Sequence, residues 1–242
     1  MVAGAAAADA VARARRLPKL CTGLHIVLVE GVPALPPERL PDLVDSSGHF
    51  RTDMARLGFD IFAKTAARAQ LAAEVEAQFA AYAATGLPLD HVNAHKHFHL
   101  HPTIAGTIIA VGRRYGVTAM RVPVEPRSVI AQIEPAPIGL SWVTGPYAAL
   151  LGRAARRAGL KTPDAVFGLA WSGAMTAPRV EAVLKRLPEG LSEIYAHPAT
   201  AGGFAGHAPG YRYAEELAAL TAPEVVAAAR RGDVALGGYA DF

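Results

Sequence analysis

The chain has few cysteines, few aromatic residues and little charge. Its 242 residues include one cysteine, Cys21, which excludes an internal disulfide framework and a zinc cluster built from cysteines. Aromatic residues make up 7% of the chain and charged residues 19%, and the formal net charge is +3. A nucleic-acid groove needs a basic stripe with stacking aromatic rings, and the sequence shows no such pattern. We therefore expect no nucleic-acid partner.

Long apolar runs are also missing from the sequence. A bilayer-spanning helix needs about 20 apolar residues, whereas the apolar stretch from Ile138 to Gly152 is shorter and contains Pro146. This stretch fits a buried helix or, alternatively, a lip that faces a membrane surface. A single cysteine is typical of a reducing compartment. We expect a cytoplasmic protein, with peripheral membrane contact as an open alternative.

Short apolar segments alternate with helix-like stretches along the chain. The expected strands cover 20–29, 91–94, 119–122, 165–169, 192–197 and 234–236. The expected helices cover 5–16, 66–85, 102–115, 147–158, 179–186, 213–220 and 223–231, with a loop over 33–53 and a proline-rich connection over 123–137. Strands separated by helices indicate βαβ units and a parallel sheet. We predict one α/β domain over 1–242, an incomplete or modified (β/α) barrel, with an open doubly wound sheet as the second interpretation.

Histidine is concentrated in one short segment, HVNAHKHFHLH. Five of the nine histidines lie there, namely His91, His95, His97, His99 and His101. An extended backbone would point the last four to one face, whereas a helical turn after Ala94 would pair His95 with His99. Converging imidazoles suit zinc or another divalent metal. The alternative is a histidine-rich surface loop with no fixed ligand.

Two further histidines stand on expected strands elsewhere in the chain. His25 lies in GLHIVL, and His197 lies in EIYAHPA just before a proline. Each alone is more often a core histidine with a hydrogen-bond partner. Together with the histidine cluster they make three strand-associated segments, and α/β folds place their sites at the carboxyl ends of strands. This pattern predicts one site built from residues of all three segments.

The three segments together resemble a known family. They are GLHIVLVEGVP (23–33), HVNAHKHFHLHP (91–102) and EIYAHPA (193–199), and in this order they are similar to the signature segments of the YdjC-like (ChbG-type) carbohydrate deacetylases. LVEGVPALPP (28–37) and VDSSGHF (44–50) are similar to the hopanoid-biosynthesis-associated branch of that family. The resemblance implies a polysaccharide-deacetylase-like (β/α) barrel and one divalent metal ion, Mg or Zn, held by one Asp and two His.

The resemblance also implies roles for individual residues. His25 and His95 would be the two metal-ligating histidines, and His197 would be the catalytic acid or a substrate contact. The residues that would line the substrate site are His97, His99 and Arg121.

The chain departs from the family pattern in two places. The family has Asp in an H-x-D-S-H segment where this chain has Asn93 and then Ala94, which removes a possible supporting carboxylate. The family also begins with a strand ending in Asp-Asp-Phe-Gly, which supplies the third metal ligand and the presumed catalytic base. Residues 1–4 resemble the end of the family's second strand instead. A start site assigned too late and a true truncation both fit this difference.

The expected function is metal-dependent removal of an N-acetyl group from an acetylated amino sugar. The substrate would be a small molecule or lipid-linked, such as a chitooligosaccharide or an N-acetylglucosaminyl hopanoid. One alternative is a catalytically incomplete fragment that binds sugar or metal and could form a homodimer through an unpaired sheet edge. Another alternative is a metal carrier without a cleft. A large separation between His25 and His95 would contradict the enzyme interpretation.

Overall fold

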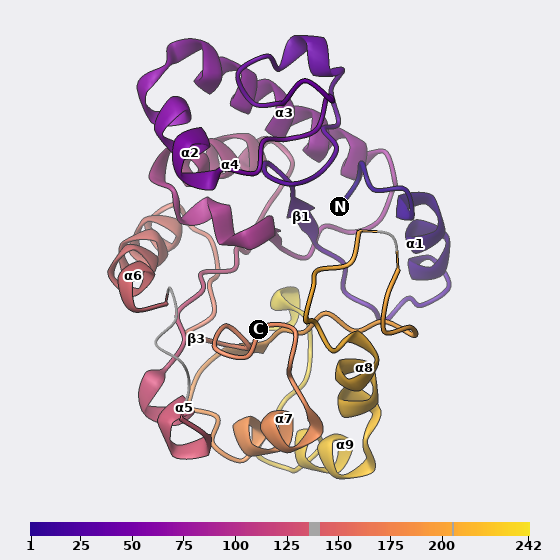
Figure 1. The fold of residues 1–242 in the computed structure, drawn as a ribbon. Coiled ribbons are helices and arrows are strands. Elements are labelled where there is room, and N and C mark those ends of the chain that lie inside the picture. The colour runs from indigo at the N-terminus through magenta and orange to yellow at the C-terminus, as the bar shows by residue number, and fades with distance from the viewer. Residues whose placement is uncertain (136–140, 205) are drawn as a thin grey trace. The chain divides into compact units, whose positions relative to one another are not determined.

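The computed structural model describes residues 1–135, 141–204 and 206–242, with the backbone alone over 141–144. Its contacts divide the chain into two compact units (Figure 1). Unit 1 comprises Met1–Val122, Leu150–Thr162 and Gly237–Phe242, and unit 2 comprises Pro123–Ala149 and Pro163–Leu236. That the whole chain behaves as one domain stays a prediction.

Unit 1 holds a parallel sheet and most of the histidines. Its elements are α1 (Ala7–Ala14), β1 (Leu24–Ile26), η1 (Pro37–Arg39), α2 (Met54–Ala63), α3 (Thr65–Ala83), β2 (Val92–Ala94), η2 (His95–Leu100), α4 (Pro102–Arg114) and η3 (Tyr239–Asp241). The helix α6 (Ser141–Arg157) contains residues of both units.

The sheet of unit 1 is parallel, as the alternation of strands and helices predicts. Strand β1 pairs with β2 in the register Leu24↔Val92, His25↔Asn93 and Ile26↔Ala94. Isolated parallel bridges, Val92↔Met120 and Ala119↔Lys161, continue the sheet beyond β2. Neighbouring residues in a parallel register share a face of the sheet, so the side chains of His25 and Asn93 lie side by side.

Helices α3 and α4 pack together in unit 1, and α3 also contacts β1 (Figure 1). Leu71, Val75 and Phe79 of α3 are spaced four residues apart, so they form one apolar stripe that is fully buried. Gln78 lies beside this stripe. Its side-chain oxygen accepts from the N–H of Val27 at 3.0 Å, and its NH₂ group donates to the carbonyl of Val27 at 2.7 Å. Because Val27 directly follows β1, this buried amide fixes the end of the strand that carries His25.

Unit 2 has its own short parallel sheet and its own core. Its elements are α5 (Arg127–Ile133), β3 (Ala165–Phe167), α7 (Ala177–Leu184), β4 (Ser192–Ile194), α8 (Tyr213–Thr221) and α9 (Pro223–Ala229). Strands β3 and β4 pair in parallel, with Ala165 opposite Ser192. Apolar side chains from these elements form one cluster, which includes Ile130, Phe167, Trp171, Met175, Val180, Val183, Ala219 and Val225.

Two helices of the structure were not predicted, and one predicted strand is wrong. Helix α2 was not predicted, although Asp53 caps it by accepting a hydrogen bond from the N–H of Arg56 at 3.0 Å. Helix α5 lies in the segment predicted as a proline-rich connection, because Pro126 stands just before its first turn, where a missing N–H costs nothing. The strand predicted over 234–236 is wrong, since those residues have no strand partner in the described chain.

The α/β class is therefore confirmed, and the barrel is not. Among the described residues the strands form two short parallel sheets, β1–β2 and β3–β4, and no closed sheet. The strands span three residues each, shorter than the ranges predicted from apolar runs. The barrel type stays a prediction.

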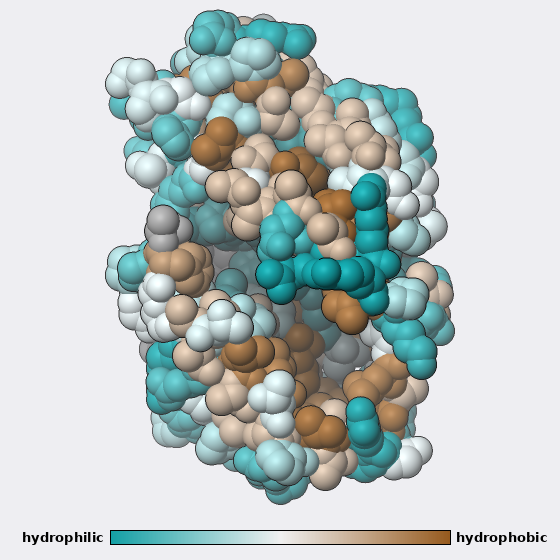
Figure 2. Space-filling view, turned by 90° about the vertical axis from the view of Figure 1, so that its right-hand side faces the viewer, coloured by the Kyte–Doolittle hydropathy of each residue, from teal (hydrophilic) through white to brown (hydrophobic). Residues whose placement is uncertain are grey.

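The prediction for the apolar stretch Ile138–Gly152 lies partly outside the described residues. From Ser141 onward its backbone is helical in α6, with Pro146 inside the helix. In the described part of the chain, no helix is both long enough and apolar enough to cross a membrane. On the face in Figure 2, hydrophobic groups lie among hydrophilic residues. Peripheral membrane contact stays a prediction.

Replacing Gly168 by alanine should strongly destabilise unit 2. Gly168 follows β3 with a φ of +112°, and an added Cβ would collide with the backbone oxygen of Tyr195. We expect the free energy of unfolding, measured by urea denaturation, to fall by about 3 kcal/mol from backbone strain and overpacking. Gly116→Ala is the control, because Gly116 has a φ of +74° but open space around its Cβ. Equal losses in both variants would contradict the collision as the cause.

Candidate metal and substrate site

The register of β1 and β2 fixes the first histidine of the site. His25 Nδ1 lies 2.5 Å from Oδ1 of Asn93, its direct neighbour across the two strands. An amide oxygen only accepts, so Nδ1 carries the hydrogen and donates it. Burial, the largest cause, lowers the pKa of His25 to about 3, against an upward effect of this hydrogen bond. Near pH 7 the ring is neutral, and its Nε2 has a free lone pair.

The histidine cluster adopts neither of the two backbone forms expected from the sequence. It forms tight turns in η2, in which Lys96 and His97 have left-handed φ values of +51° and +53°. This conformation costs about 1–2 kcal/mol for each residue with a side chain. The predictions of one shared face for the last four histidines, and of a His95–His99 pair, are therefore wrong. Strained backbone of this kind is concentrated at functional sites.

After the tight turn, the ring of His95 lies beside that of His25. The ring centroids of His25 and His95 lie 5.8 Å apart, with an angle of 74° between the ring planes. His97 and His99 form a second pair, with ring centroids 6.1 Å apart. The expected convergence of His25 with His95 is thus confirmed as geometry, while their roles as ligands stay predictions.

His99 is the most deeply buried histidine of the cluster. Its Nε2 lies 2.9 Å from the backbone oxygen of Arg121, so Nε2 donates and Nδ1 is left as an acceptor. Burial, the largest cause, lowers the pKa of His99 to about 3. Electrostatic repulsion from His97 and Arg121 acts in the same direction, against an upward effect of the hydrogen bond to the Arg121 backbone. Its buried Nδ1 has no hydrogen-bond partner in the described chain. Arg121, itself 9% exposed, thus contacts His99 through its main chain.

The imidazoles of His25 and His95 suit a divalent metal in their chemistry and their proximity. His25 offers a neutral nitrogen whose orientation is fixed by a hydrogen bond on the other side of the ring, which is the usual arrangement of a metal-ligating histidine. A catalytic zinc takes three protein ligands. In the ranges that the structure describes, no group of three His, Cys, Asp or Glu side chains gathers to hold a metal. The described residues therefore fit as two ligands of a larger set.

His197 belongs to unit 2, where it follows β4. Its ring lies between Tyr195 and Tyr211, with centroid distances of 5.5 and 5.0 Å. Its backbone N–H donates to Glu216 of α8, a fully buried carboxylate that also accepts from the N–H of Met175 at 2.9 Å. The ring of His197 is therefore held by aromatic neighbours and its backbone by a buried charge.

Sequence reasoning missed Glu216 as a residue that positions His197. A charged residue in the sequence AEEL of a helix is expected on a solvated face, and its neighbour Glu215 does form an exposed ion pair with Arg212. Helical periodicity places one of the two glutamates inward, but it carries no information on which backbone groups that carboxylate meets. No signal in the sequence pairs Glu216 with the segment of His197.

The comparisons with known proteins agree with the family resemblance. The family model described as YdjC-like protein matches residues 1–231. A carbohydrate deacetylase of Mus musculus is 31% identical, over 92% of this chain and 78% of its own length. A carbohydrate deacetylase of Thermoanaerobacter pseudethanolicus is 25% identical, over 75% of this chain and 61% of its own length. A chitooligosaccharide deacetylase of Serratia marcescens is 30% identical, over 48% of this chain and 44% of its own length.

A solved structure supports the fold. It comes from Enterococcus faecalis and is named for a proposed cellobiose-phosphate cleavage. The similarity covers 96% of this chain and 82% of that one, with a TM-score of 0.70 and 24% sequence identity. At this identity the likeness concerns the fold alone.

The parallel α/β fold and the similarity to the deacetylases above define a class of α/β protein related to carbohydrate deacetylases. The chain belongs to the YdjC-like family.

Proposed function

We propose that the chain carries out metal-dependent removal of an N-acetyl group from an acetylated amino sugar. The observation that carries the proposal is the close approach of His25 and His95, which come from two different segments that resemble signatures of the family. Relatives named carbohydrate deacetylase and chitooligosaccharide deacetylase support the same chemistry. The proposal includes the incomplete (β/α) barrel that the resemblance implies.

In this proposal His25 and His95 hold the metal ion. A divalent metal of this kind polarises the amide carbonyl and lowers the pKa of a bound water. Neutral His25 offers its Nε2 lone pair without first losing a proton, because burial keeps its pKa at about 3. Asn93 keeps the other nitrogen of this ring engaged. A further ligand from outside the described cluster completes the set.

The other predicted site residues act on the substrate. His99 keeps a buried acceptor, Nδ1, that is suited to a substrate hydroxyl or a water molecule. In this proposal the neighbouring His97 and Arg121 also line the substrate site, because both lie next to His99. His197 donates a proton to the leaving amine, the general-acid step of amide hydrolysis. Its ring contacts with Tyr195 and Tyr211 restrict the orientations from which it can donate.

The substrate in this proposal is a chitooligosaccharide or an N-acetylglucosaminyl lipid. The first follows from relatives named chitooligosaccharide deacetylase. The second follows from the segments 28–37 and 44–50, which are similar to the hopanoid-associated branch. A lipid-linked substrate would bring the protein to a membrane surface, so the two substrates also differ in where the reaction takes place.

Acetate release tests the proposed function directly. The purified chain is incubated with an acetylated chitooligosaccharide and Mg²⁺ or Zn²⁺, and free acetate is measured over time. We expect release that stops on chelation with EDTA and returns when the metal is restored, because the metal supplies the activated water. Release that continues in EDTA would contradict metal dependence. Binding of sugar and metal without any release would favour the incomplete binding fragment.

A further inference from the structure

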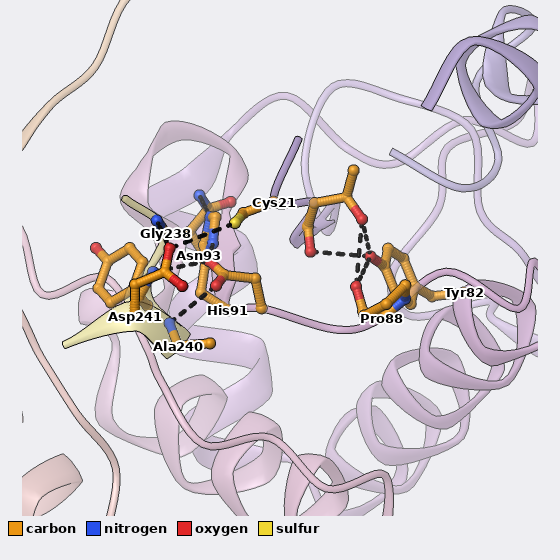
Figure 3. A network of polar contacts seen from close by, with 11 residues as sticks. Cys21, Tyr82, Pro88, His91, Asn93, Gly238, Ala240 and Asp241 are labelled. Atoms are coloured by element: carbon orange, nitrogen blue, oxygen red, sulfur yellow. Dashed lines mark hydrogen bonds and ion pairs between the residues drawn. The ribbon is translucent and has the colours of Figure 1, made fainter. Parts of the chain in front are cut away.

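A buried carboxylate links the C-terminal segment to the strand of the site. The backbone N–H groups of Tyr239 and Ala240 donate to Asp90 at 3.2 and 3.0 Å. His91 Nδ1 donates to the same carboxylate at 2.8 Å (Figure 3). Burial raises the pKa of Asp90, but these hydrogen bonds together outweigh it and leave the pKa below its ordinary value. Asp90 is therefore an ionised acceptor in the folded chain.

The hydrogen bonds continue from His91 to His25. With Nδ1 of His91 donating to Asp90, its Nε2 accepts from the side-chain N–H of Asn93 at 3.4 Å. Asn93 then turns its oxygen to His25 and accepts from Nδ1 of that ring at 2.5 Å. The two atoms of the Asn93 amide fix these roles, because its nitrogen only donates, to Nε2 of His91, and its oxygen only accepts, from Nδ1 of His25. The series of donor and acceptor roles that begins at the backbone N–H groups of the C-terminal segment therefore ends with the hydrogen on Nδ1 of His25.

Two glycines make room for this series of groups. A Cβ on Gly23, two residues before His25, would lie 2.6 Å from the ring of His91. A Cβ on Gly238 would lie 2.7 Å from Oδ1 of Asp90. The ring of His91 also packs on Tyr239, with centroids 4.8 Å apart. The glycine of the GLH motif thus has a packing reason that is separate from metal binding.

We propose that Asp90, His91 and Asn93 are positioning residues that hold His25 in the form whose Nε2 lone pair can bind a metal. The metal-binding role in this inference rests on the proposed function, whereas the hydrogen bonds that orient His25 do not depend on it. These three side chains form a hydrogen-bonded relay, and the backbone N–H groups of Tyr239 and Ala240 anchor its far end at Asp90. A metal-ligating histidine usually donates its other N–H to an oxygen acceptor, and the amide oxygen of Asn93 is that acceptor for His25.

The tautomer of His25 tests the relay without any metal or substrate. Nitrogen-15 NMR of the imidazoles in the wild-type chain should show the hydrogen of His25 on Nδ1 and that of His91 also on Nδ1. Asn93→Leu removes the acceptor, so the His25 signals should move toward a mixture of tautomers. Its affinity for Co²⁺, measured by titration, should fall by about 10–100-fold, as expected for loss of a supporting hydrogen bond. Asn93→Asp keeps an acceptor and should retain both properties.

Gln70→Met is the matched control. Gln70 is a second amide of unit 1, half-buried on α3, and its hydrogen bonds go to Asp42 rather than to the relay or to the strand of His25. This variant should lose stability yet keep the His25 tautomer and the Co²⁺ affinity. Hydrogen on Nε2 of His25 in the wild type, or equal Co²⁺ affinities in Asn93→Leu and Gln70→Met, would overturn the relay. If the deacetylase proposal alone is wrong, acetate release is absent from the wild type while the NMR and Co²⁺ results stand.

Discussion

Replacing His95 by alanine is expected to abolish metal-dependent acetate release. The ring of His95 lies beside that of His25, and these two imidazoles are the metal ligands that we propose. Loss of a supporting hydrogen bond costs metal affinity about 10–100-fold, so the loss of a ligand should exceed about 100-fold. Co²⁺ titration and acetate release, measured on the same preparation, give the two values.

His101→Ala is the control for this experiment. His101 comes from the same cluster, but its ring packs on Phe98 and lies against Gly58 of α2. Burial lowers the pKa of His101, as it does for His25, so the control loses a similar histidine. We expect metal affinity and acetate release to stay near the wild-type values. Equal activity in His95→Ala and His101→Ala would remove His95 from the metal site.

Glu216→Gln is expected to destabilise unit 2 and loosen the segment of His197. The two carboxylate oxygens accept from the backbone N–H groups of Met175 and His197 inside the protein. Glutamine has the same shape but turns an NH₂ group toward one of these donors. A buried donor that loses a charged acceptor costs about 1.5–3 kcal/mol, which urea unfolding would show as a lower midpoint. Hydrogen exchange at the amides of Met175 and His197 should become faster.

The neighbouring residue provides the comparison. Glu215 precedes Glu216 in α8, but it is exposed and pairs with Arg212 on the surface. Surface ion pairs contribute about 0–1 kcal/mol, so Glu215→Gln should unfold close to the wild-type midpoint. A shift in Glu216→Gln no larger than that in Glu215→Gln would show that the buried carboxylate does not support this segment.

Much of the site was predictable because it depends on the order of segments. The resemblance to the family implied that His25 and His95 share one site, and the structure places their ring centroids 5.8 Å apart. The grouping within the cluster was not predictable. The rules for which side chains share a face assume a regular strand or helix. The left-handed conformations of Lys96 and His97 break that regularity.

The hydrogen-bond partners were less predictable than the fold class. Alternating apolar segments identified the parallel α/β class, because local periodicity reports which face is buried. The helices α2 and α5 were missed where short, capped segments carry weak periodicity. The relay joins Asp90 to backbone groups about 150 residues further along the chain. Contacts of such sequence separation leave no local pattern.

The sequence by itself determined the family, the fold class and the two histidines that meet. It could do so because signature segments and apolar periodicity are local properties of the chain. The tertiary structure alone decided which imidazole nitrogen is free, which carboxylates are buried and what each one accepts. The physical reason is that a hydrogen-bond direction depends on every donor and acceptor around it, and folding brings those groups together from distant parts of the chain.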